Sequence, residues 1–256
     1  PEPRPALWWG RLYQLMALYR DHAVVLRTWK LGEADRIVSM HTHDNGKVRG
    51  VAKGVRRTKS KFGARLEPLS HVAVQLYRGR GDLDTITQVE TVDRFANLRT
   101  SPDRFARGQA ILEAVDQVAQ DREPDQELHV MLVRALRTLD QNDSPLVIAA
   151  FFLKVLAHEG LMPQLDACVS CGAEDLLEAF DFDDGGVLCR SCRRGRPVTA
   201  EALRLMEQIL GGGLGGVLAE PVGPATGEVD LLATALMEHH LERRLRSVAV
   251  LDQTQL

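Results

Sequence analysis

The sequence predicts an α+β protein, with a small β-barrel in its N-terminal third and α-helices over most of the remaining chain. Short segments of β-branched or alternating apolar residues follow one another between residues 21 and 98. Apolar residues recur at helical spacing from about Ser101 onward, and two pairs of cysteines interrupt this pattern. We therefore expect an N-terminal extension (1–20), a barrel domain (21–98), a helical domain (99–166 and 197–256) and a cysteine module inserted in it (167–196).

Five strands are expected in the barrel domain. They are centred on Ala23–Leu26, Ile37–Met40, a segment that starts at Lys47, His71–Tyr77 and Asp84–Val89. The turn before the third strand contains Asn45-Gly46, the strongest short signal for a β-hairpin. Five short strands in roughly 70 residues fit a closed barrel of the oligonucleotide-binding (OB) type, which binds nucleic acid through strand faces and loops.

A run of positive charge accompanies the third strand and extends over residues 47–65, the basic tract. It contains no Asp or Glu, and without its eight cations only 24 basic residues would face 35 acidic ones. Positive charge concentrated on a net acidic chain favours a polyanionic partner over a purely solvating role. We predict that the tract binds nucleic acid through Lys47, Arg49, Lys53, Arg56, Arg57, Lys59, Lys61 and Arg65.

The alternation of a β-strand predicts how these cations are displayed. Lys47, Arg49 and Lys53 share one parity, so they are expected on one face of the third strand. Residues 56–61 are expected to form a flexible basic loop. Phe62 and Tyr77 are the nearest aromatic residues that could stack on bases, although packing is the more common role for each.

The helical domain is marked by caps and apolar stripes. Pro102 is suited to the first turn of a helix, and Ser144-Pro145 precedes a helix that is apolar on nearly every side and should be central. Further helices are expected over Leu128–Leu139, Thr199–Ile209 and Glu228 to about Ser247, with a flexible break at Gly211–Gly216. Arg243, Arg244 and Arg246 would then lie near a helix C-terminus, where cations are favoured.

The four cysteines form a C-x2-C pair, a gap of 17 residues and a second C-x2-C pair. This spacing is a strong signal for one zinc ion, because two thiolates from each pair complete a tetrahedron at about 2.3 Å per bond. The expected ligands are Cys168, Cys171, Cys189 and Cys192. Disulfides, which need an oxidising compartment, and an iron–sulfur cluster are the alternatives. A four-thiolate zinc site has no open position, so it would be structural.

Several other functions find little support in the sequence. The phosphate-binding motif G-x-x-x-x-G-K-[ST] is absent, which argues against an ATPase. His240-Leu241-Glu242 copies the H-x-E of zinc deaminases but follows the cysteines instead of preceding them. No apolar run reaches the roughly 18 residues of a membrane helix, and the N-terminus lacks the pattern of a signal peptide, so we expect a cytoplasmic protein without a membrane partner.

Several segments together resemble the RecO family of bacterial DNA repair proteins. In the N-terminal part they are Leu31–Val38, Val51–Arg57, Ser60–Gly63, Leu66–Pro68 and Thr85–Gln88. In the C-terminal half they are Leu161–Pro163, Cys168–Gly172, Gly185–Cys189 and the tail Leu241–Ser247. The resemblance covers nearly everything after about residue 21. It implies an OB-fold N-terminal domain and a helical domain that carries a zinc module in many members.

The resemblance also implies a function. Members of this family are non-enzymatic mediators of recombination in DNA repair that bind single- and double-stranded DNA and anneal complementary strands. They act with RecR, and often RecF, to load RecA onto DNA coated with single-strand binding protein (SSB), whose acidic tail docks on the helical domain. Such a protein would be associated with the nucleoid. A zinc-dependent nuclease or deaminase and an RNA-binding factor are the alternative hypotheses from the residues alone.

Overall fold

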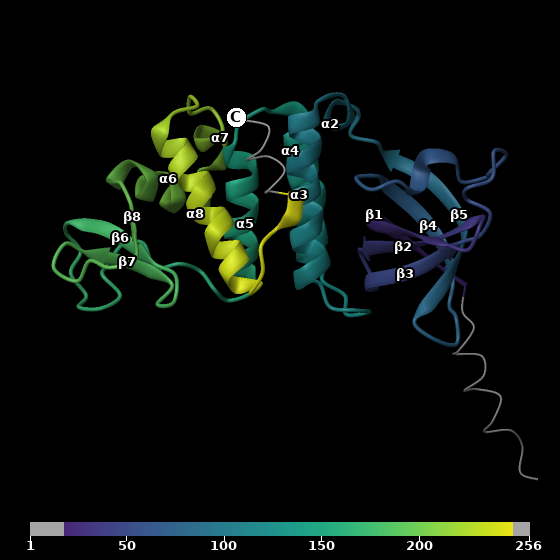
Figure 1. The fold of residues 1–256 in the computed structure, drawn as a ribbon, viewed down its shortest axis with the longest axis horizontal. Coiled ribbons are helices and arrows are strands. Elements are labelled where there is room, and N and C mark those ends of the chain that lie inside the picture. The colour runs from purple at the N-terminus through teal and green to yellow at the C-terminus, as the bar shows by residue number, and fades with distance from the viewer. Residues whose placement is uncertain (1–17, 248–256) are drawn as a thin grey trace, which may run out of the picture. The chain divides into compact units, whose positions relative to one another are not determined.

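The computed structural model describes residues 18–247, which form two compact units. The barrel unit contains the described chain up to Phe95 together with Val115–Val133. The helical unit contains Ala96–Ala114 and the described chain from Arg134 onward. Figure 1 shows the strands of the first unit and the helices and small sheet of the second. Most of the expected N-terminal extension, residues 1–17, and the last part of the expected helical domain, residues 248–256, lie outside the described residues.

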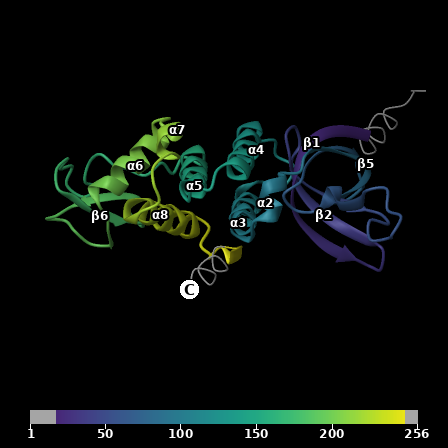
Figure 2. The same ribbon diagram turned by 90° about the horizontal axis from the view of Figure 1, so that it is seen from above.

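All five expected strands are present, as β1 (Leu18–Leu31), β2 (Asp35–Thr42), β3 (Gly46–Ala52), β4 (His71–Tyr77) and β5 (Leu83–Asp93). They form a closed barrel in the order β1-β2-β3-β5-β4, in which β4 pairs back to β1. Figure 2 shows this unit from a second side, with β1, β2 and β5 labelled. Only the β3–β5 pair is parallel among these strands. This is an OB-fold barrel. Its first strand begins at Leu18, inside the segment that was expected to be an extension.

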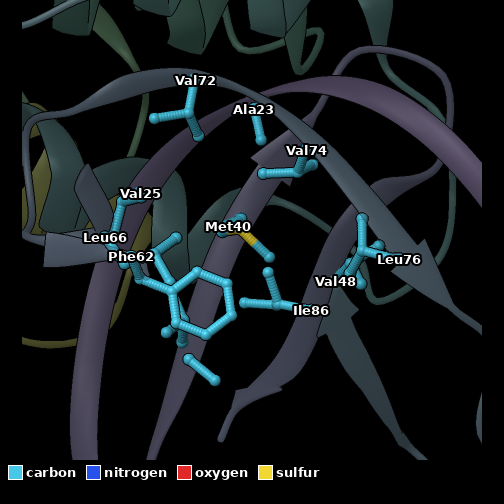
Figure 3. Close-up of a cluster of buried hydrophobic side chains, with 12 residues drawn as sticks. Ala23, Val25, Met40, Val48, Phe62, Leu66, Val72, Val74, Leu76 and Ile86 are labelled. Carbon is cyan, nitrogen blue, oxygen red and sulfur yellow. The ribbon is translucent and has the colours of Figure 1, made fainter. Parts of the chain in front are cut away.

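Alternate side chains of the strands fill the barrel interior, as the period of two predicts. Val25, Met40, Leu76 and Ile86 are almost completely buried there (Figure 3). Phe62, which precedes the 3-10 helix η1 (Gly63–Leu66), points its ring into the same cluster and is only 2% exposed. Phe62 is therefore a core residue, which confirms the packing role expected as the more common one and excludes base stacking.

Residues 115–133 pack against the barrel within the same unit. The backbone of Lys47 donates to the carbonyl of Gln120 over 3.3 Å and accepts from the amide of Arg122 over 2.9 Å. The Arg122 guanidinium also donates to the fully buried carboxylate of Asp84 over 3.0 Å. Tyr19 donates its hydroxyl to the same carboxylate over 2.5 Å. A buried charge needs such partners, so these contacts fix the segment beside β3 and β5.

The helices are α2 (Ala96–Thr100), α3 (Pro102–Val118), α4 (Gln126–Gln141), α5 (Leu146–His158), α6 (Ala200–Leu210), α7 (Leu214–Val217) and α8 (Pro224–His240). Helix α5 packs against α6 and α8, and its residues from Leu146 to Leu153 are all buried, which confirms the predicted central helix. Thr199 caps α6 as expected, because its hydroxyl accepts from the amide of Ala202. Among the described helices, none combines the length and the apolar character needed to cross a membrane.

Two expectations in the C-terminal region are wrong. The glycine-rich break contains the short helix α7. Helix α8 begins at Pro224, four residues early, because Pro224 stands at its first position and the Thr226 hydroxyl accepts from the amide of Gly223. The helix ends at His240, and Glu242 already has a φ of +51°. Arg243 and its neighbouring arginines therefore lie beyond the helix and not in its last turn.

Candidate nucleic-acid interface and metal centre

The part of the basic tract that lies on β3 faces outward but is already paired. Lys47 and Arg49 alternate with the buried Val48, as predicted, but β3 ends at Ala52, so the expectation that Lys53 lies on the same strand is wrong. The Lys47 ammonium donates to the backbone carbonyl of Asp116 over 2.7 Å and lies 3.8 Å from the carboxylate of Asp121. The Arg49 guanidinium donates to the same carboxylate over 2.8 Å. Residues 115–133 therefore neutralise much of the charge on this strand face.

The loop that follows β3 is anchored to the turn between β1 and β2. The amide of Gly54 donates to the Asp35 carboxylate over 2.7 Å, and the amide of Arg56 donates to the carbonyl of Ala34 over 3.0 Å. The Arg56 guanidinium also donates to the carbonyl of Glu33 over 2.9 Å. These bonds hold two loops together that are separated by about 20 residues in sequence, and this is the end of an OB barrel where nucleic acid is commonly bound.

The remaining cations of the tract fall into two groups. Lys61 donates to the carbonyl of Thr87 over 2.8 Å, and Arg65 donates to the carbonyls of Lys61 and Phe62. Lys53, Arg57 and Lys59 are exposed, and none forms a side-chain hydrogen bond or ion pair with a residue between 18 and 247. The eight cations stay predicted DNA contacts, and the last three are the ones most available to a phosphate.

Sequence reasoning missed three residues next to this loop, Arg27, Trp29 and Lys30. All three are exposed near the end of β1. The Arg27 guanidinium lies 5.1 Å from the centre of the Trp29 ring. Arg27 and Trp29 are two residues apart in a strand. This spacing is the signal that could have found them, because it places both side chains on the outer face of β1. The two aromatic residues considered from the sequence lie closer to the tract, but Phe62 is buried and Tyr77 is half-buried.

The four cysteines come together in the helical unit. The small sheet of β6 (Leu177–Asp181), β7 (Gly186–Cys189) and β8 (Arg196–Pro197), in the order β7-β6-β8, brings the second pair next to the first. All four sulfur atoms lie within 4.8 Å of one another. The Sγ atoms of Cys171 and Cys189 are 3.7 Å apart, which matches the edge of about 3.8 Å that a tetrahedron with zinc–sulfur bonds of about 2.3 Å has.

The chemistry of the cluster also fits a metal. All four cysteines are free of disulfides. Hydrogen bonds from the backbone amides of Cys189, Cys171 and Ser170 lower the pKa of the Cys168 thiol to about 6, because they stabilise its thiolate form. The hydrogen bond from the Ala173 amide lowers the pKa of Cys171, but those with the other three thiols outweigh it and raise this pKa to about 12. Thiolate is the form that binds metals. The four cysteines thus form a potential metal site with four sulfur ligands.

Two glycines make this geometry accessible. Gly172 ends the first pair with a φ of +77°, a conformation that residues with a side chain rarely adopt. Gly186 begins β7, and a Cβ atom there would lie 2.4 Å from Cγ1 of Val169 and 2.9 Å from the backbone oxygen of Gln164. The chain segments around the cysteines are therefore closer together than any larger residue at position 186 would permit.

Three of the four arginines of the cysteine module form ion pairs within it. Arg190 donates to Glu178 over 2.6 Å, and Arg193 lies 3.8 Å from the same carboxylate. Arg194 pairs with Asp181 and Asp184. This module therefore displays less unpaired positive charge than the loop after β3.

The comparisons with known proteins match both parts of the chain. The family model described as "Recombination protein O N terminal" matches residues 16–95, and "Recombination protein O C terminal" matches residues 99–249. The boundary between them follows the end of β5 at Asp93. A protein named "DNA repair protein RecO" from Nocardioides sp. (strain JS614) is 43% identical over 247 residues, which cover 92% of this chain and all of that protein.

Proposed function

Because the chain belongs to the RecO family of DNA repair proteins, we propose that it is a non-enzymatic mediator that binds DNA and anneals complementary strands. The observation that carries this proposal is the loop after β3, where Lys53, Arg57 and Lys59 extend from an OB barrel without ion-pair partners among the described residues. Cations on such a loop neutralise phosphates of any sequence. Neutralising two backbones at once lowers the repulsion between complementary strands, and this step requires no nucleotide hydrolysis.

The proposed partners follow from the family. We propose that the protein acts with RecR, and in some settings RecF, to load RecA onto single-stranded DNA coated with SSB. The acidic tail of SSB would bind the helical unit. This role would place the protein in the cytoplasm at the nucleoid, with both single- and double-stranded DNA as ligands.

We further propose that Cys168, Cys171, Cys189 and Cys192 hold one structural zinc ion. Four sulfur ligands leave no coordination position for a reacting water, so this ion would stabilise the module and not cut or deaminate DNA. A zinc-dependent nuclease or deaminase would instead need an open metal position. The annealing experiment distinguishes this enzyme from the non-enzymatic mediator.

The first experiment measures annealing of complementary strands without ATP, using bare strands and strands coated with SSB. We expect annealing in both cases, and slower annealing of coated strands when SSB lacks its terminal residues. Equal rates with full-length and truncated SSB would refute targeting by the tail. Strand cleavage or base conversion in these reactions would support the enzyme instead.

The second experiment reverses the charges of the loop with the triple variant K53E/R57E/K59E. Its matched control is R134E/R137E/R244E, which changes three exposed cations of the helical unit. If the three loop cations each contact a phosphate, the plot of log affinity for single strands against log salt should change in the loop variant. Its slope should be less negative by about 2 than that of the unmodified protein. Equal losses of DNA affinity in the loop and control variants would place DNA binding elsewhere. If the unmodified protein bound RNA more tightly than DNA, an RNA-binding factor would be favoured instead.

A further inference from the structure

An exposed apolar band crosses the outer face of the barrel next to the anchored loop. In the register of the sheet, Trp29 of β1 lies opposite Ile37 of β2, and Ile37 lies opposite Val51 of β3. Residues directly opposite each other in a sheet point to the same side, and Ile37 and Val51 are both only half-buried. The three side chains therefore form one row, in which Trp29 is 37% exposed.

Cations border this band. The Arg27 guanidinium lies over the Trp29 ring at 5.1 Å, on the same outer face of β1. On the other side, the amide of Gly54 bonds to Asp35, the second residue before Ile37, so Lys53 and the loop beyond it are held beside the band. Arg27 and Lys53 form no ion pair with any other residue in the range 18–247.

The combination identifies the kind of ligand. An exposed tryptophan in a sheet face, bordered by unpaired cations, is complementary to a polyanion that also offers flat apolar surfaces. Single-stranded nucleic acid has both properties, because its bases are not covered by a partner strand. A duplex offers the same phosphates but keeps its base faces inside the stack.

We propose that Trp29 stacks on an unpaired base of the bound strand and makes this site select single strands over duplex. Arg27 holds the ring in its orientation, and Ile37 and Val51 extend the apolar surface for a neighbouring base. The cations of the loop contact the flanking phosphates. This inference rests on the DNA-binding role proposed above, and it assigns base stacking to a residue outside the basic tract.

The test compares Trp29→Ala with Trp29→Phe on three ligands of equal length: single-stranded DNA, the same backbone with abasic sites throughout, and duplex DNA. Removing one stacking contact should weaken binding to the normal single strand about 5- to 150-fold. Binding to the abasic strand and to duplex should stay unchanged, and Trp29→Phe should restore most of the affinity. The salt dependence should also stay unchanged, because stacking releases no counterions.

A direct signal comes from fluorescence. The chain has three tryptophans, so replacing Trp8 and Trp9 by Phe leaves Trp29 as the only one. Its emission should be quenched by the single strand and not by the abasic strand. Equal loss of affinity for all three ligands in Trp29→Ala, or binding without quenching, would overturn the inference. If the unmodified protein bound no DNA at all, the proposed function itself would fail.

Discussion

The Arg49 guanidinium donates to the Asp121 carboxylate over 2.8 Å, and this pair joins the outer face of β3 to a segment 72 residues further along the chain. The side chains of both residues are roughly half exposed. An exposed pair of this kind stabilises a fold by about 0–1 kcal/mol. Asp121 therefore matters more as an intramolecular competitor, because it occupies a cation that a phosphate would otherwise contact.

Replacing Asp121 by Asn should raise the affinity for DNA about two- to fivefold, since it releases Arg49 and removes a negative charge near Lys47. Fluorescence anisotropy with a labelled single strand, measured over a range of salt concentrations, would show the gain and a steeper salt dependence. Asp103→Asn is the control, because Asp103 is as exposed as Asp121 and forms an ion pair with Arg107 in the helical unit. A lower affinity in Asp121→Asn would mean that Asp121 instead positions Arg49 for binding.

Replacing Cys189 by Ser should remove the metal and unfold the module around it, while the barrel persists. A structural zinc ion contributes on the order of 10 kcal/mol to local folding. Elemental analysis would show about one zinc per unmodified chain and little in the variant, and hydrogen exchange would rise in β6 and β7 only. Ser191→Ala is the control, as it lies between two ligands without being one. Absence of metal from protein purified without chelator would refute the prediction, and iron with visible absorption would indicate a cluster.

Gly186→Ala should weaken the metal module without changing any ligand. The added methyl group would meet the side chain of Val169 at 2.4 Å and the backbone of Gln164 at 2.9 Å, so backbone must shift at a cost of about 1–3 kcal/mol. Faster release of metal to a chromogenic chelator would report this. Gly215→Ala, where a Cβ meets nothing within 4 Å, should release metal at the original rate. Equal release rates in both variants would contradict the packing argument.

Five of the eight histidines gather on the outside of the barrel, where its strands meet α4. His129 of α4 lies at ring distances of 5.6, 5.5 and 5.9 Å from His41, His43 and His71, and His22 lies 6.0 Å from His71. The Nδ1 atoms of His41 and His129 are 3.4 Å apart, and both residues are buried. Burial lowers the pKa of His41 to about 4 and that of His129 to about 3.

This cluster predicts a barrel unit that loses stability in acid. Below a pH of about 6.5 the unfolded chain binds protons at these two positions that the folded chain does not, so stability falls as pH falls toward 4. The loss between pH 7 and pH 5 should be about 3–4 kcal/mol for the two histidines together. Urea unfolding followed by Trp29 fluorescence, with Trp8 and Trp9 replaced by Phe, would measure it. The double variant H41Q/H129Q should show a flatter pH dependence, and an unchanged slope would exclude these two histidines as its source.

Local patterns were sufficient for most elements. Alternation located the five strands, Asn45-Gly46 located a hairpin, and the cysteine spacing located the cluster of sulfur atoms. Local patterns could not reveal that Asp121 pairs with Arg49, because the two residues meet only through the packing of segments that are distant in the sequence. The end of α8 was also misplaced, since apolar spacing continues to Leu245, which is buried although it lies outside the helix.

The closure of the barrel bears on how neighbouring copies could occupy one long strand. Because β1 pairs with β4 and β3 with β5, the described barrel has no open sheet edge that a second copy could extend by adding a strand. Adjacent copies would have to meet through side chains or through the helical unit. Each copy could then leave a DNA strand singly, without separating a continuous intermolecular sheet.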